Sequence, residues 1–198
     1  MASFIFDKYI SSVGHNETPA ITVPITETSG VGICLIKREE NDAELKKNDD
    51  FSVISGLIAV NELDNNAPAI AELNGQTTIK FVPVNSEYDT EGELVTNGYT
   101  MVKSHSIKFG ANPAVTTINN VVGAVVFAYS GDTLPVNPSY DNSIPVCYID
   151  FGGVVNSKNG PFKVVFKNGI PDKEDSIDDT ETDLAKKYEA YGTIFIMK

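Results

Sequence analysis

The residues best suited to bind a ligand are acidic and lie close together, in the segment EDSIDDTETD at residues 174–183. Carboxylate oxygens are the hard ligands that calcium prefers, but this segment has neither the spacing nor the central glycine of an EF-hand loop. Since runs of like charge usually face water, we expect a solvated acidic loop here, with calcium binding as the alternative. The candidate calcium ligands are Asp175, Asp178, Asp179 and Glu181.

Side chains for nucleophilic or metal-assisted catalysis are scarce. His15 and His105 are the only histidines, so a histidine-based triad or a multi-histidine metal site is difficult to assemble. The chain contains no GxSxG, HExxH, GxxxxGK[ST] or GxGxxG motif. A carboxylate pair for glycoside hydrolysis cannot be singled out among 27 acidic residues. We therefore expect no enzymatic activity and no cofactor, and we name no catalytic residue.

The charge balance argues against nucleic-acid binding. The net charge is −12, and Arg38 is the only arginine, so few side chains can neutralise or bind phosphate. No apolar run reaches the ~18 residues that a membrane helix needs, and residues 1–14 do not have the pattern of a signal peptide. We expect a protein that is made in the cytoplasm and binds neither membranes nor nucleic acid directly.

The two cysteines, Cys34 and Cys147, are far apart in the chain and form no CxxC pair. Both fall in apolar strand patterns, where a free cysteine behaves as a small hydrophobic residue. A disulfide between them stays open, because two lone cysteines do not define an oxidising compartment.

The elements that would position any site are dominated by two apolar runs, at residues 121–129 and 144–151. Both are rich in Val, Ile, Phe and Tyr and have the length of one strand. The connection at residues 130–143 is rich in proline, glycine, asparagine and aspartate, which is typical of an exposed loop. The pattern predicts a central β-hairpin.

Further strands are predicted along the rest of the chain. Asn74–Gly75, the dipeptide favoured in tight turns, predicts a hairpin between residues 69–73 and 77–84. One short helix is predicted at residues 183–191, from apolar residues at helical spacing. The other predicted strands cover residues 3–7, 20–26, 31–37, 51–60, 99–109, 162–167 and 193–197.

These elements predict an all-β, mainly antiparallel fold, with a β-sandwich or jelly roll as its architecture. We expect one domain over residues 1–198, with residues 1–19 forming an N-terminal arm, long loops and the single helix near the C-terminus.

Three segments together resemble a pattern of small structural proteins from tailed bacteriophage virions. They are VVGAVVFAY at residues 121–129, IDFG at residues 149–152 and FKVVFKNGI at residues 162–170, within a region of about a quarter of the chain. The resemblance implies a β-rich component of a virion head, neck or tail, acting through contact surfaces rather than an active site.

Two functions follow as expectations. The first is a non-enzymatic assembly subunit, specifically a capsid auxiliary (decoration) protein that binds major-capsid subunits and is homo-oligomeric or bound to the lattice. Its strand-forming segments at residues 3–7 and 193–197 could pair with a neighbour's sheet edge, which makes Phe4 and Phe6 candidate contacts. The alternative is a carbohydrate- or receptor-binding jelly-roll module of a tail fibre or baseplate, with tyrosines as the stacking residues.

Overall fold

The computed structural model describes residues 2–15, 29–40, 42–59, 70–72, 80–83, 87–88, 94–95, 100–104, 106–109, 117–130, 134–135, 138, 142–158, 162–166 and 192–197. Contacts divide the chain into two compact units, the first made of Met1–Gly75 and Lys108–Phe162 and the second of Gln76–Ile107 and Lys163–Lys198. The described part is mostly β, with antiparallel pairing, as the sequence predicts. The single domain expected from the sequence stays a prediction.

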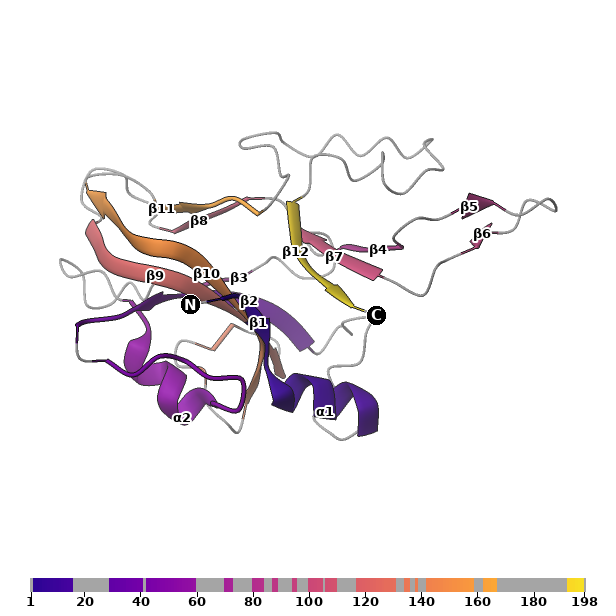
Figure 1. The fold of residues 1–198 in the computed structure, drawn as a ribbon, viewed down its shortest axis with the longest axis horizontal. Coiled ribbons are helices and arrows are strands. Elements are labelled where there is room, and N and C mark those ends of the chain that lie inside the picture. Colours follow the sequence, from indigo (N-terminus) through magenta and orange to yellow (C-terminus); the bar gives the residue numbers. More distant parts are fainter. Residues whose placement is uncertain are drawn as a thin grey trace. The chain divides into compact units, whose positions relative to one another are not determined.

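A five-stranded antiparallel sheet forms the first unit (Figure 1). Its central pair confirms the predicted hairpin strands, although the second strand continues well beyond residue 151. In spatial order the strands are β1 (Phe4–Ile5), β10 (Ser143–Lys158), β9 (Thr117–Ser130), β2 (Ser29–Lys37) and β3 (Ile70–Glu72).

The central strands are apolar on both faces, which explains why their sequences read as continuous apolar runs rather than alternating ones. One face carries Val125 and Phe127 and belongs to a core cluster with Cys34, Ile36 and Tyr148. The opposite face is also buried, with Ile33, Leu35, Ala124 and Val126 all within 1% of complete burial.

One helix precedes β2 in the sequence and another follows it, and neither was predicted. The nine-residue α1 (Asp7–His15) begins where the first predicted strand was expected to end. A strand was predicted at residues 51–60, but the described part, residues 51–59, forms α2 (Phe51–Ile54) and the 3-10 turn η1 (Ser55–Leu57), with an isolated bridge from Ile58 to Ile36.

The physical reason for this correction lies at the start of α2. The Asp50 carboxylate accepts a hydrogen bond from the Ser52 amide at 2.9 Å, as a helix N-cap does. Phe51 and Ile54 are three residues apart, so one helical turn directs both side chains into the core cluster. Leu45, in the charged segment between β2 and α2, is also buried in this cluster.

The second unit contains a three-stranded antiparallel sheet in the order β12 (Gly192–Met197), β7 (Thr100–Ser104) and β4 (Lys80–Pro83). Short strands β5 (Glu87–Tyr88) and β6 (Leu94–Val95) pair with each other. The predicted strand at residues 99–109 is divided into β7 and β8 (Ile107–Phe109), and β8 pairs with β11 (Phe162–Val164).

The predicted hairpin around Asn74–Gly75 is wrong. β3 pairs with β2, whereas β4 pairs with β7, so the two flanking strands belong to different sheets. Turn propensity favours a hairpin locally, but pairing with partners distant in sequence determines which edge each strand joins. The predicted edge strand at residues 20–26 and the predicted helix at residues 183–191 lie outside the described residues.

Candidate functional site at the bulged end of the sheet

Three neighbouring strands become irregular at the same level of the sheet. Between β9 and β10 the register passes from Asp150 opposite Gly123 to Val155 opposite Val121, so β10 carries three more residues than its partner over this interval. The register between β2 and β9 also shifts, after Ile36. Bulges of this kind redirect side chains and are common at functional surfaces.

The extra residues of β10 form an exposed apolar protrusion, which we call the β10 bulge (residues 151–155). Val154 and Val155 are 59% and 40% exposed. Gly152 has φ +75, a left-handed conformation that favours glycine, and its amide donates a 3.1 Å hydrogen bond to the Asp150 carboxylate. At the base of the bulge, the ring of Phe151 stacks on Phe162 with centroids 6.1 Å apart.

A second set of hydrogen bonds holds the strands together beside the bulge. The amide of Asn120, which also has a left-handed φ of 57°, donates to the Asn156 side-chain oxygen at 2.8 Å. The Asn120 carbonyl accepts from the Arg38 amide at 3.1 Å. Asparagine tolerates this backbone region better than most residues. The β10 bulge is therefore flanked by hydrogen bonds at both ends, from Gly152 to Asp150 and from Asn120 to Asn156.

Two sets of polar groups are described beside the bulge, an exposed ion pair and a buried phenol. Arg38 forms a 2.8 Å ion pair with Glu44, but both side chains are exposed, so the pair adds little stability. The pKa of Tyr148 is raised to about 12, first by burial and then by the charge of Asp150; Arg38 lowers it and Glu44 raises it by smaller amounts. The neutral phenol donates a 3.4 Å hydrogen bond to the Val122 carbonyl. A tyrosine in this state is a structural donor rather than a general base.

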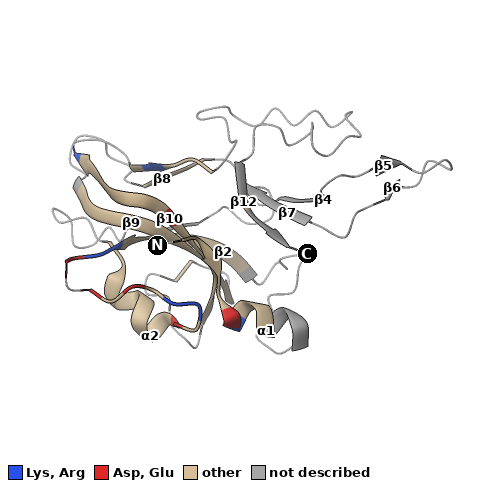
Figure 2. Cartoon of the chain, in the orientation of Figure 1, with Lys and Arg blue, Asp and Glu red and all other residues tan. Residues whose placement is uncertain are grey.

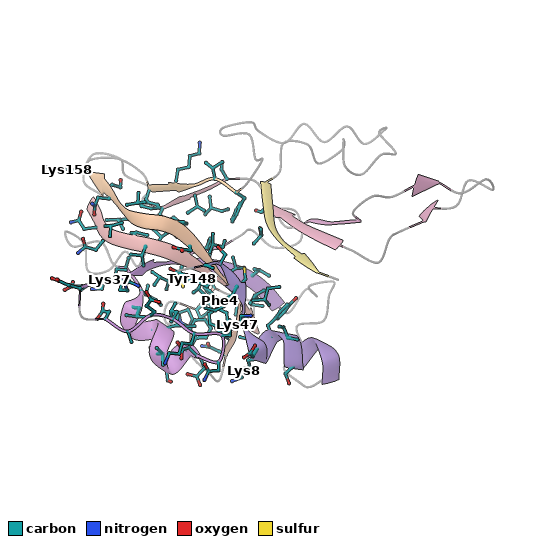
Figure 3. All side chains as sticks on the ribbon, in the orientation of Figure 1. Phe4, Lys8, Lys37, Lys47, Tyr148 and Lys158 are labelled. Carbon is teal, nitrogen blue, oxygen red and sulfur yellow. The ribbon has the colours of Figure 1, made fainter. Side chains whose placement is uncertain are left out.

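Charge is distributed unevenly around the sheet. Figure 2 shows charged residues gathered in the segment between β2 and α2, while β9 and β10 are almost free of them. Only Asp150 and Lys158 are charged within β10, and Lys158 lies at the far end of the strand (Figure 3). The β10 bulge is thus an apolar surface on an acidic chain.

The two cysteines are free and buried, and the register excludes a disulfide between them. Cys34 lies opposite Val125 and Cys147 lies opposite Val126, on the two sides of β9. Because successive strand residues point to opposite faces, the two thiols are separated by the sheet itself. Burial raises the pKa of each thiol to about 12, so neither is a nucleophile at neutral pH.

Phe4 and Phe6, the predicted contact residues, pack against their own chain. Phe6 is 0% exposed, and Phe4 is partly buried against the same core cluster. The Phe4 ring lies 5.1 Å from that of Phe6 and 5.4 Å from that of Tyr148, and Figure 3 shows Phe4 and Tyr148 as neighbours. Contact with a partner through these residues stays a prediction.

The predicted calcium ligands Asp175, Asp178, Asp179 and Glu181 lie outside the described residues, as does His105. His15 is the last residue of α1. Within the described ranges, no group of three or more His, Cys, Asp or Glu side chains is placed to hold a metal ion. None of the helices described there is long and apolar enough to cross a membrane.

The sequence analysis missed the β10 bulge, although its signal is visible. Gly152 and Gly153 interrupt an otherwise β-branched and aromatic strand, and a glycine inside a strand commonly marks a bulge. No protein-family model, no curated protein and no solved structure matches the chain.

Proposed function

We propose that the chain is a non-enzymatic structural subunit of a bacteriophage particle, specifically a capsid auxiliary (decoration) protein that binds major-capsid subunits. It would be synthesised in the host cytoplasm and reside in the virion. The finer architecture that fits this proposal is a β-sandwich or jelly roll built around the five-stranded sheet.

The observation that carries the proposal is the spatial meeting of the three segments that resemble phage virion proteins. Residues 121–129 lie in β9 and residues 149–152 lie in β10, where the two strands are paired. The third segment begins at Phe162, whose ring stacks on Phe151. Segments that are separate in sequence therefore build one structural feature, the base of the β10 bulge.

The β10 bulge has the properties of a contact surface. Its two valines are exposed although they are apolar, and hydrogen bonds to Asp150 and between Asn120 and Asn156 hold its backbone. A surface fixed in its conformation before binding loses little entropy on association. No comparable observation favours the carbohydrate-binding alternative, because Tyr9, Tyr129 and Tyr148, the tyrosines whose side chains are described, are buried.

Substitution of the bulge tests this function. The double variant V154D/V155D places two charges on the proposed contact and should sharply reduce the amount of chain that co-purifies with particles. The matched control is Val53→Asp in α2, because Val53 is 42% exposed, close to the 40% of Val155, but lies outside the bulge. Circular dichroism verifies that both variants fold. Equal incorporation of the two variants would contradict a role for the bulge in assembly.

A further inference from the structure

The edge of β10 is occupied by a short segment of the same chain, which we call the clasp (residues 3–9). Only two of its residues, Phe4 and Ile5, are paired in strand geometry, opposite Tyr148 and Cys147. We call the part of the β10 edge that the clasp occupies (residues 146–150) the seat. Two flanking hydrogen bonds extend the contact: the Phe6 amide donates to the Val146 carbonyl and the Asp150 amide donates to the Ser3 hydroxyl, both at 3.0 Å.

The side chains of the clasp fill the core beside this edge. Phe6 is fully buried, and Tyr9 is 5% exposed. The helix α1 packs against β10. The pKa of Tyr9 is raised by burial and then by the charge of nearby Cys147. Without the clasp, Tyr148 and Cys147 would face water and the β10 edge would present unpaired backbone groups, which is a template for pairing with another chain.

The seat therefore requires an occupant, and any copy of the chain carries the sequence that fits it. If the clasp moves from its own β10 to that of a neighbour, every ladder bond and every buried ring is formed again, so the exchange has a small energetic cost. Thirteen residues, 16–28, lie between α1 and β2 in the sequence.

One exposed side chain also favours a second copy as the partner. Ile10, one residue after the buried Tyr9, is 56% exposed on α1. A reciprocal exchange has two-fold symmetry and brings the same surface of both copies together, so the two α1 helices are available to cover each other's apolar residue.

We propose that, in concentrated solution and in its assembled form, the chain exchanges clasps, so that residues 3–9 of one copy occupy the β10 edge of a second copy. This inference rests on the proposed function, since it names the contact through which subunits associate. It is tested on the purified chain without particles, so that its failure is distinguishable from failure of the assembly role.

The register supplies the test. Ile5 lies opposite Cys147, and because Phe6 and Val146 are hydrogen-bonded, this pair is a non-hydrogen-bonded one with Cα atoms about 4.5 Å apart. That separation suits a disulfide. A cysteine introduced at position 5 should therefore cross-link to native Cys147 when oxidised glutathione is present during refolding, before burial protects that thiol, within one chain or between two.

A mixture of one double variant and the wild-type chain separates a cross-link within one chain from a cross-link between two. One copy carries I5C and C147S, so it has a reactive clasp and no seat thiol, and the other is the wild-type chain with Cys147. The two are refolded together at high concentration, oxidised and examined on a non-reducing gel. Clasp exchange predicts a disulfide-linked heterodimer that disappears when the same mixture is refolded and oxidised at low concentration, whereas absence of the heterodimer at high concentration overturns the proposal.

Three controls make either outcome decisive. The single variant Ile5→Cys must cross-link in dilute solution, within one chain, which shows that the clasp occupies the seat. If it does not, the proposal fails. The variant Ile5→Ser should give no cross-link. I5C/C147S alone should also remain uncross-linked, because Cys34 lies on the other side of β9 and is buried.

Discussion

The ring of Phe127 lies across Gly32 on the neighbouring strand, where the two residues are directly paired. A Cβ atom at Gly32 would lie 2.5 Å from Cζ of Phe127 and 2.8 Å from Leu134. Gly30 is related to Tyr129 in the same way. Gly123 pairs with Asp150, and a Cβ there would lie closest to the Ile149 carbonyl oxygen and 2.5 Å from the Tyr148 hydroxyl. Aromatic rings thus fill the space that three glycines leave on one face of the sheet.

This relationship predicts that Gly32→Ala lowers the free energy of unfolding by about 1–3 kcal/mol, because Phe127 is fully buried and cannot move aside. The matched control is Gly56→Ala, since nothing lies within 4 Å of a Cβ at Gly56. That variant should change stability by no more than about 1 kcal/mol. Chemical denaturation measures both, and equal effects would contradict the packing described.

The thiols provide a second prediction. Cys34 and Cys147 should not react with a thiol reagent at pH 8 in the folded chain and should both react in denaturant, because their pKa values are raised to about 12 by burial. Rapid labelling of either thiol without denaturant would show that the sheet is covered less completely than described.

The same pKa values set a pH dependence with a definite sign. Each thiol releases its proton more readily in the unfolded chain, near pH 9, than in the folded one, near pH 12. The contribution of the thiols to the free energy of unfolding is therefore fully present below about pH 9. Above that pH it falls, by up to ~1.4 kcal/mol per pH unit for each thiol. Cys147→Ala should lose stability less steeply than wild type between pH 9 and 11. An unchanged slope would contradict the assignment.

A fourth prediction concerns Asp50, at the start of α2. Asp50→Ala should reduce stability by about 1 kcal/mol, because the Ser52 amide loses its acceptor. Asp50→Asn keeps an acceptor and should recover most of the loss.

Hydrogen bonds from the Ser52 hydroxyl and then its amide lower the pKa of Asp50, so this contribution is present above the pKa of the unfolded chain and is lost on acidification. Thermal melts of the three proteins at neutral and acidic pH measure this. Similar acid sensitivity in Asp50→Asn and wild type would show that the cap does not depend on the charge.

The parts of the fold that were predicted correctly are those in which a single stretch of sequence determines the structure. β9 and β10 are long, apolar and rich in β-branched residues, and no other element fits such runs. Where the structure depends on distant partners, prediction failed, as with β3 and β4. At α2, Asp50 before an apolar residue is a helix-start signal that the sequence analysis overlooked. An apolar segment this short fits the hydrophobic period of a helix as well as that of a strand.

The candidate site was less predictable than the sheet. The length of β10 and the position of its bulge depend on the register with β9, which is set by contacts along both strands. The burial of Phe6 likewise follows from a seat on β10, more than a hundred residues away in the chain. The strand-forming pattern at residues 3–7 identified Phe4 and Phe6 as candidate contacts with a partner. It did not indicate that their own sheet would cover them.

The central claim, that the chain is a structural component of a phage particle, is tested most directly by its copy number in purified particles. Particles from cells that produce the chain are purified by density gradient, and isotope-labelled peptides of the chain are used to quantify it against the major capsid protein. The proposal predicts many copies per particle, in a fixed ratio to the capsid protein. A chain that stays entirely in the particle-free fraction would contradict it.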